Sequence, residues 1–255
     1  PMLYIGEKVG MGGPKVDIAL DPLEGTTITA KGGENALSVL AMAEQGGFLH
    51  SPDIYMHKIA YGKKYESLDI DPESPSDEIV KNFAKYSGIK IENIVVCILD
   101  RPRHKELIDK VRSIGARIKL IPDGDVSAVI ATSFEDSGVD IYMGIGGSPE
   151  GVLAAAALRC IGGKIYTKLI FDNDKQIERA KLMGISDPNR IYLTNDLASG
   201  DVMFSATGVT DGTLLKGVLI KNEVATTQSV VMRSKTKTVR YVGASHDLRV
   251  KDIIK

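Results

Sequence analysis

Short apolar runs alternate with polar, glycine-rich or proline-rich segments along the whole chain. Runs rich in β-branched and aromatic residues are typical of buried strands, and longer segments with Ala, Leu or spaced charges are typical of helices. We expect strands at residues 16–20, 54–61, 94–99, 117–121 and 139–145. We expect helices at residues 77–86, 104–114, 126–132, 149–161 and 175–184.

The order of these elements predicts the fold class. Between residues 94 and 161 strands and helices alternate, which favours an α/β layer with mainly parallel strands. Residues 202–242 instead contain short β-rich runs separated by turns. Residues 36–44 form an apolar run that fits either a strand or a helix, and its Ala, Leu and Met content favours a helix. The expected fold class is α/β, with α and β elements arranged in layers.

A mostly polar segment with two prolines, residues 62–76, is the best candidate for a connection between subdomains. We therefore expect an N-terminal subdomain over residues 1–65 and a C-terminal α/β subdomain over residues 66–255. The chain starts directly with an apolar run at residues 2–5, although a natural terminus is usually polar. We expect further residues upstream of Pro1 in the complete protein, so that the N-terminal subdomain is incomplete as given.

Composition narrows the classes of function. A formal net charge of -1 and 5% aromatic residues supply neither the basic field nor the stacking platforms that nucleic acids favour. No stretch reaches the roughly 20 apolar residues needed to cross a bilayer, and no signal-peptide pattern is visible. Cys97 and Cys160 lie in apolar runs and fit buried, reduced thiols better than a zinc site or a disulfide. We expect a cytoplasmic protein that binds neither nucleic acid nor membranes.

The segment that we expect to carry chemistry begins where the first strand ends. Asp21 and Glu24 place two carboxylates three residues apart, with Pro22 fixing the backbone between them. Gly25 allows close approach to a ligand, and Thr26 adds a hydroxyl. Oxygen ligands on a rigid turn suit Mg²⁺ or Mn²⁺, and such a metal suits a phosphate ester as substrate. The alternative is an ordinary Asp-Pro turn with Glu24 in water, and spacing alone does not separate the two.

Three further polar clusters follow expected strands, at residues 100–104, 123–125 and 146–151. Because ligands of open α/β sheets bind beyond the carboxyl ends of the strands, all three clusters could converge on one cleft. The glycines of the last cluster precede a helix whose first N–H groups favour an anion, and Glu150 in the first turn could bind a metal. The alternative is a plain capped helix start, where an acidic residue is favourable anyway.

The other two clusters also leave two interpretations open. Arg101 and Arg103 flank a proline, and guanidinium groups suit phosphate oxygens, but solvated surface residues are the alternative. Asp123 and Asp125 flank a glycine and could accept hydrogen bonds from sugar hydroxyls or bind a metal, with a type I turn as the alternative. Tyr55 is more typical of a core residue than of a ligand on sequence grounds alone.

Several motifs together point to a known family. PMLYIGEKVG, DPLEGTT, PRH, IPDGDV, GIGGSPEGV and FSATGVTDGTLLKGV, in this order, resemble class II fructose-1,6-bisphosphatases of the metal-dependent, lithium-sensitive phosphatase superfamily. The resemblance runs from Pro1 to about Val242. DPLEGT alone is moderately specific, and its combination with PDGD and GIGGSPEG is highly specific. The resemblance implies a sugar-phosphatase fold with alternating α and β layers in two subdomains.

The resemblance also implies a reaction. It is the hydrolysis of the 1-phosphate of fructose 1,6-bisphosphate to fructose 6-phosphate by metal-activated water, in gluconeogenesis, with Mn²⁺ or Mg²⁺ as the cofactor. By motif match the metal ligands would be Asp21, Glu24 and Glu150, and Thr26 would be the catalytic residue that places the attacking water and the scissile phosphate. The substrate-binding residues would be Glu24, Gly25, Thr26, Tyr55, Arg101, Pro102, Arg103, Asp123, Gly124, Asp125 and Gly147.

One departure from the family pattern leaves alternatives open. Family members carry an N-terminal segment with further metal and catalytic groups upstream of the match to Pro1, and this sequence lacks it. Sedoheptulose 1,7-bisphosphate is a second possible substrate, alone or in a dual activity. A non-catalytic sugar-phosphate-binding protein is the alternative if the segment is truly absent. A homo-oligomer is also expected.

Overall fold

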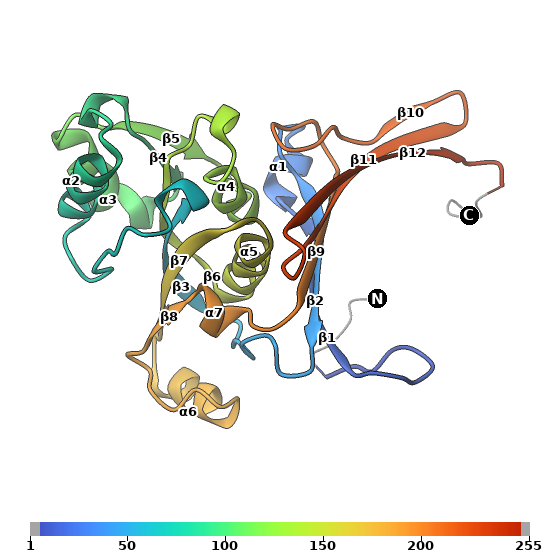
Figure 1. Ribbon diagram of the computed structural model, residues 1–255, viewed down its shortest axis with the longest axis horizontal. Helices are drawn as coiled ribbons and strands as arrows, with labels where there is room; N and C mark the ends of the chain where they lie inside the picture. The colour runs from blue at the N-terminus through green and yellow to red at the C-terminus, as the bar shows by residue number, and fades with distance from the viewer. Residues whose placement is uncertain (1–5, 251–255) are drawn as a thin grey trace.

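The computed structural model describes residues 6–250, which fold into two six-stranded sheets with helices between and beside them (Figure 1). The strands are β1 (Val16–Glu24), β2 (Leu37–Glu44), β3 (Tyr55–Gly62), β4 (Val95–Leu99), β5 (Arg117–Ile121), β6 (Ile141–Gly147), β7 (Gly163–Ile170), β8 (Ile191–Leu193), β9 (Val202–Gly208), β10 (Leu219–Lys221), β11 (Val224–Arg233) and β12 (Thr238–Asp247). The helices are α1 (Thr26–Ala30), α2 (Ser76–Ser87), α3 (Lys105–Ser113), α4 (Asp125–Ala131), α5 (Ser148–Ile161), α6 (Asp174–Leu182) and α7 (Thr194–Leu197). Short 3₁₀ helices occupy Lys63–Tyr65, Ile91–Asn93, Pro102–His104 and Glu135–Ser137. The expected layered α/β class is confirmed.

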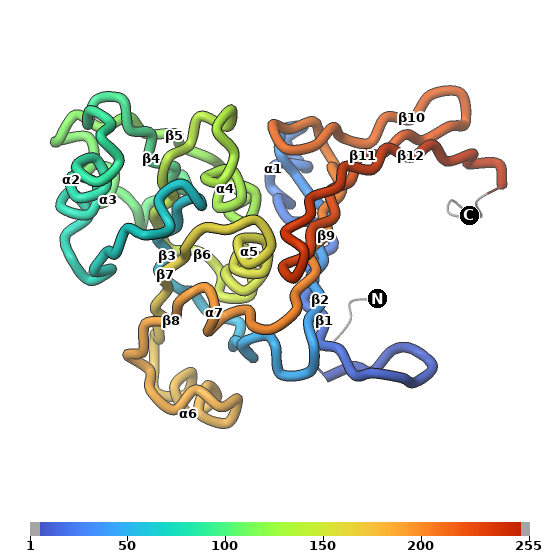
Figure 2. Tube along the Cα trace, in the orientation of Figure 1, coloured from blue at the N-terminus to red at the C-terminus, as the bar shows by residue number. Residues whose placement is uncertain are grey.

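The first sheet is antiparallel and joins both ends of the described chain. Its order is β1-β2-β9-β11-β10, and β12 also pairs with β11. Figure 2 shows the blue N-terminal strands beside the orange and red strands from the end of the chain. The β-rich runs expected after residue 202 are therefore strands that complete a sheet begun near residue 16.

Residues 36–44, for which we favoured a helix, contain strand β2, so that prediction is wrong. Leu37, Val39, Ala41 and Ala43 are buried and alternate with more exposed residues. Both edges of the strand are hydrogen-bonded, to β1 on one side and to β9 on the other. These pairings outweigh the modest helical preference of Ala, Leu and Met.

The second sheet has the order β5-β4-β6-β3-β7-β8 and mixes strand directions. Strand β4 runs parallel to β5 and β6, as we expected for alternating strands and helices. The remaining pairs, β3 with β6, β3 with β7 and β7 with β8, are antiparallel. The prediction of mainly parallel strands, made from residues 94–161, is confirmed for the three strands of that segment, and β3, β7 and β8 add antiparallel pairs to the same sheet.

Helix α5 lies between the two sheets, while α2 and α3 cover the far side of the second sheet (Figure 1). Ala154, Ala155, Ala156 and Ala157 are each at most 1% exposed, so this helix is buried on almost all sides. A helix that is apolar all round fits only inside a core, and small side chains let both sheets approach it closely. The first turn of α5 thereby becomes a fixed point between the two sheets.

The boundary that we expect between residues 65 and 66 stays a prediction. Strands from the two sides of this boundary pair with each other in both sheets. Strand β3 lies in the centre of the second sheet, between β6 and β7. Strand β9 pairs with β2 in the first sheet. The apolar run at residues 2–5 lies outside the described residues. Within residues 6–250, none of the helices combines the length and the apolar character that crossing a membrane requires.

The packing of α2 against the second sheet leads to one stability prediction. Phe83 in α2 is fully buried and packs against Tyr65 and Tyr61, with ring centroids 4.7 and 6.1 Å away. Phe83→Ala is expected to lower the free energy of unfolding by about 3 to 5 kcal/mol, because it removes buried surface and leaves a cavity. Urea denaturation measures this. Tyr86→Ala, at an exposed position of the same helix, should change the value by less than about 0.5 kcal/mol, and equal losses in both variants would contradict the packing described here.

Candidate active site

Two tight turns from different sheets face each other and hold each other in place. The first follows β1 and leads into α1, and the second follows β5 and leads into α4. Glu24 Oε1 accepts a hydrogen bond from the Val126 N–H in α4, and Asp123 Oδ2 accepts one from the Thr27 N–H in α1, each at 3.1 Å. Each turn thus supplies a carboxylate that caps the helix of the other turn.

Backbone conformation places these carboxylates. The residue after each one is a glycine in the left-handed region, Gly25 with φ 91° and Gly124 with φ 86°, where other residues are strained. The pairing of β1 with β2 shifts register between Asp21 and Glu24, which indicates a β-bulge. Without an extra residue, side chains three apart would point to opposite faces of the strand, and the bulge lets both line the same cleft.

The facing turns form one wall of a cleft of about 340 Å³. The structure brings the three polar clusters expected at strand ends together here with the 21–26 turn. Of the residues predicted for the site, all except Pro102 and Gly124 line the cleft. The lining consists of Asp21, Leu23, Glu24, Gly25, Thr26, Tyr55, Leu99, Arg101, Arg103, Asp123, Asp125, Gly146, Gly147 and Glu150.

Arg101 and Arg103 form a basic rim of the cleft, and hydrogen bonds to backbone carbonyls partly fix their side chains. Arg103 donates from Nε and Nη2 to the Ile145 carbonyl, at 3.1 and 2.8 Å, and its guanidinium lies 4.7 Å from the centre of the Tyr55 ring. These contacts leave Nη1 available to an anion. Tyr55 is 49% exposed at this rim, so the structure does not place it in the core. Arg101 lines the cleft and donates to the carbonyl of Asp100.

The glycines at the junction of β6 and α5 are explained by the space that neighbouring side chains occupy. A Cβ at Gly146 would overlap the carboxylate of Asp125, and a Cβ at Gly147 would overlap that of Glu150. At Gly151 it would meet the Met56 side chain. Gly146 and Gly147 therefore make room for acidic side chains beside the cleft, and Gly151 makes room for Met56, a steric role that the sequence pattern alone did not indicate.

Asp21, Glu24 and Glu150 form an acidic wall of the cleft, and their ionised forms are destabilised there. Burial raises the pKa of Glu24 well above its ordinary value, and the neighbouring Asp125 raises it further. Burial likewise raises the pKa of Asp21 and of Glu150. Glu24 Oε2 and Glu150 Oε2 are buried without a hydrogen-bond partner among the described residues. Lys58 is paired with Asp125, and its charge also lowers the pKa of Glu150, yet burial remains the largest cause for Asp21, Glu24 and Glu150. Because desolvated carboxylates are costly, the wall suits a further cation.

The donor set fits a hard divalent cation, because carboxylate oxygens are the ligands that Mg²⁺ and Mn²⁺ prefer. The two orphaned oxygens are the observation that supports this fit. Within residues 6–250, however, no three His, Cys, Asp or Glu side chains are already grouped closely enough to hold a metal ion. Asp21, Glu24 and Glu150 therefore remain predicted ligands.

Sequence comparison decides the family. A family model described as bacterial fructose-1,6-bisphosphatase, glpX-encoded, matches residues 1–246. The chain belongs to this family. The predicted resemblance to class II fructose-1,6-bisphosphatases is thereby confirmed.

Similar relatives carry a double name. Proteins from Crocosphaera subtropica, Trichodesmium erythraeum and Synechococcus elongatus are 42%, 40% and 42% identical to this glpX-family chain. Each match covers 96% of the chain and 79% of the relative. All three relatives are named D-fructose 1,6-bisphosphatase class 2/sedoheptulose 1,7-bisphosphatase.

One buried charged residue of this glpX-family site escaped sequence analysis. Lys58 in β3 is 0% exposed, and its Nζ lies 2.6 Å from Asp125 Oδ2. The available signal was a lysine inside a run otherwise typical of a buried strand, because such a residue needs a buried partner. Nothing in the sequence indicated that this partner is the first residue of α4, 67 positions away.

His104, which follows Arg103, has a structural place behind the cleft. Its Nε2 accepts a hydrogen bond from the Ile145 N–H, and its Nδ1 faces the Leu99 carbonyl, both at 2.7 Å. These partners require a neutral ring that carries its proton on Nδ1, and burial lowers the pKa of His104 in agreement. The imidazole thus ties the ends of β4 and β6 together.

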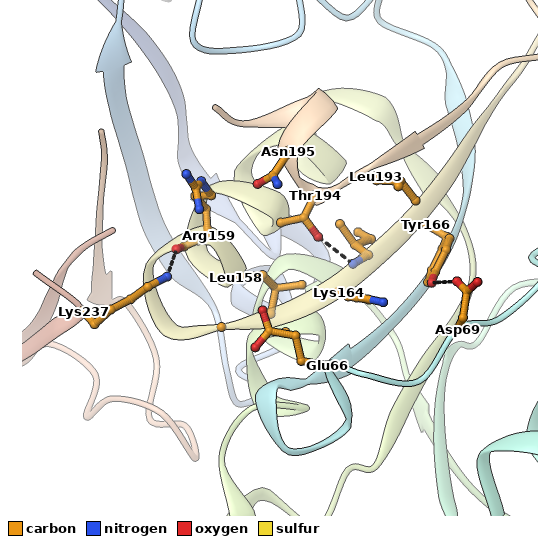
Figure 3. Close-up of a pocket in the computed structure, with 13 residues that line it drawn as sticks. Glu66, Asp69, Leu158, Arg159, Lys164, Tyr166, Leu193, Thr194, Asn195 and Lys237 are labelled. Carbon is orange, nitrogen blue, oxygen red and sulfur yellow. Dashed lines mark hydrogen bonds between the residues drawn. The ribbon is translucent and has the colours of Figure 1, made fainter. Parts of the chain in front are cut away.

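A second cavity, of about 220 Å³, lies at the opposite end of α5 (Figure 3). Its basic side chains mostly satisfy backbone carbonyls, since Lys237 donates to Arg159 O and Lys164 donates to Leu68 O. Tyr166 donates to Asp69, and the Thr194 hydroxyl accepts from the Ile165 N–H. These polar groups bond to one another or to the backbone around the C-terminal end of α5. The acidic cleft is therefore the better candidate for the functional site.

The buried acidic wall predicts an unusual pH dependence. Because folding raises the pKa of Glu24 above its ordinary value of 4.5, the folded state holds this proton more tightly than the unfolded chain does. Its contribution to stability is therefore lost as the pH rises above that value. In metal-free protein with a chelator, Glu24→Gln is expected to reduce the loss of unfolding free energy between about pH 5 and about pH 8.

Urea denaturation at several pH values measures this effect. The Gln side chain can still accept from the Val126 N–H, so the helix cap is kept. Glu178→Gln on the surface of α6 serves as the matched control and should leave the wild-type pH profile unchanged. A Glu24→Gln profile that coincides with the wild-type profile would contradict the raised pKa of Glu24 in the folded protein.

Proposed function

We propose that the acidic cleft hydrolyses the 1-phosphate of fructose 1,6-bisphosphate, giving fructose 6-phosphate and inorganic phosphate, with Mn²⁺ or Mg²⁺ as cofactor. The observation that carries the proposal is the pair of orphaned carboxylate oxygens of Glu24 and Glu150 in a cleft with two arginines on its rim. The family match and the names of the relatives support a bisphosphatase, that is, a phosphoric monoester hydrolase.

The roles of the acidic residues follow from their burial. Asp21, Glu24 and Glu150 would hold the divalent cation, whose charge relieves the cost of their desolvation. When bound, such a cation supplies Lewis acidity, which draws charge from a phosphoryl oxygen and makes water more acidic. The exposed Thr26, at the first residue of α1, can direct its hydroxyl to the attacking water and the scissile phosphate.

The rest of the cleft would bind and orient the sugar and the second phosphate. The Nη1 group of Arg103 is left available by its other contacts, and Arg101 lies on the same rim, so both suit phosphate oxygens. Gly25 and Gly147 line the cleft and allow close approach of a ligand to the backbone. Asp123 has its Oδ2 committed to the Thr27 N–H, which leaves Oδ1 for a sugar hydroxyl.

Sedoheptulose 1,7-bisphosphate is the second candidate substrate, and the double names of all three relatives favour it specifically. The proposal further includes a role in gluconeogenesis and a location in the cytoplasm, where the charge of phosphorylated sugars keeps them from crossing the membrane. A homo-oligomeric assembly is part of the proposal as well.

Phosphate release from a panel of sugar phosphates tests the proposal. The complete protein is incubated with Mn²⁺, with Mg²⁺ or with a chelator, and with each bisphosphate, fructose 6-phosphate or inositol monophosphate. We expect metal-dependent release from fructose 1,6-bisphosphate. Release from inositol monophosphate without release from either bisphosphate would overturn the substrate assignment. Tight binding of the bisphosphate without turnover would instead favour a non-catalytic binding protein.

Two isosteric substitutions test the proposed ligands. Asp21→Asn and Glu150→Gln are each expected to lower kcat/KM for fructose 1,6-bisphosphate by roughly 100-fold or more, because each removes a charge that holds the cation. Steady-state kinetics at saturating Mn²⁺ measures the loss. The surface variant Glu178→Gln should retain wild-type kinetics. Wild-type turnover in either cleft variant would remove that residue from the metal site.

A further inference from the structure

The position of Lys58 is unfavourable in free energy, because its ammonium group is completely buried in the middle of β3. Its Nζ lies 2.6 Å from Asp125 Oδ2, and the side chains of the pair are 1% and 8% exposed. Desolvation of a buried ammonium group is costly, and replacing such a pair by apolar residues is often neutral or stabilising. The pair therefore calls for an explanation beyond stability.

The surrounding loop is shaped to accommodate this pair. A Cβ at Gly146 would overlap the Asp125 carboxylate and would lie 3.1 Å from Lys58 Nζ. At Gly151 a Cβ would lie 3.4 Å from Lys58 Cε. The absence of a side chain at Gly146, near the end of β6, thus leaves the space in which the lysine reaches Asp125.

The pair fixes which oxygen of Asp125 can meet a ligand. Oδ2 accepts from Lys58 at 2.6 Å and lies 3.5 Å from the Tyr142 hydroxyl, so it is held on the buried side. Asp125 lines the cleft, whereas Lys58 and Tyr142 do not. Oδ1 is then the oxygen that remains to accept a hydrogen bond from a molecule in the cleft.

We propose that Lys58 is a positioning residue for the sugar-bisphosphate substrate: its buried ammonium holds Asp125 Oδ2, so that Oδ1 is presented to a sugar hydroxyl. The inference rests on the proposed function. Lys58 also sets a positive charge behind the wall that contains Asp21, Glu24 and Glu150. The lysine acts through Asp125 and touches neither the substrate nor the reacting atoms.

A double-mutant cycle with Lys58→Met and Asp125→Asn tests the inference in the complete protein with Mn²⁺ and fructose 1,6-bisphosphate. Lys58→Met alone should raise KM roughly tenfold and change kcat less, because a hydrogen bond that orients bound substrate is lost. In the Asp125→Asn background the same substitution should change KM less than about twofold, since the group through which Lys58 acts is already altered.

Lys58→Gln is run through the same cycle, because Lys58→Met leaves the Asp125 charge unpaired and could prevent folding. Gln keeps an N–H donor on a side chain one bond shorter, so its bond to Oδ2 is weaker and its KM should lie between the wild-type and Met values. Thermal melts establish that each variant is folded. The control Lys81→Met removes an exposed ion pair with Asp77 and should leave KM unchanged.

Three results would overturn the inference. These are wild-type KM in Lys58→Met, additive increases in KM across the cycle, and a double variant that folds when neither Lys58 variant does, which would make the lysine a folding residue. Absence of bisphosphate hydrolysis by the wild-type protein would instead contradict the proposed function itself, and the positioning role with it.

Discussion

Two crossed hydrogen bonds between the sheets are the constraint on which the cleft depends. Glu24, at the end of β1, caps α4, and Asp123, after β5, caps α1. Because each carboxylate is followed by a glycine with positive φ, the chain turns sharply into a helix at the same point on both sides. This reciprocal arrangement brings Asp21 and Thr26 of one turn next to Asp125 of the other. It also commits one oxygen of each capping carboxylate and leaves the other for ligands.

The same region concentrates charge at a cost to stability. Glu24, Asp21 and Glu150 are desolvated along the same cleft, and two of their oxygens have no partner among the described residues. Such strain persists only where the rest of the fold outweighs it, and it is typical of functional sites. Here the buried helix α5 supplies the rigid support, and the glycines at its start provide the space. A cation in the cleft would turn the costly wall into a binding site.

Sequence reasoning went furthest where the signal is local. Strands β1, β3, β4, β5 and β6 and helices α2 to α6 were predicted from the sequence pattern, whereas β7 and β8 were not. The rule that ligands bind beyond strand ends led us to expect residues 100–104, 123–125 and 146–151 at one cleft. The strand β2 was missed because pairing with β1 and β9, invisible in the sequence, overrides its helical composition. The partner of Lys58 lies 67 residues away, and the crossed caps join residues 96 and 102 positions apart. The bulge between Asp21 and Glu24 depends on the register with β2. No local pattern encodes them.

Amide hydrogen exchange at Thr27 and Val126 tests the central claim, that the two turns act as one unit. Asp123→Ala removes the acceptor of the Thr27 N–H and leaves Glu24, the acceptor of the Val126 N–H, unchanged. If the turns support each other, the variant should lose protection at both amides, by roughly tenfold or more at Val126 relative to wild type. Faster exchange at Thr27 with unchanged protection at Val126 would contradict the account.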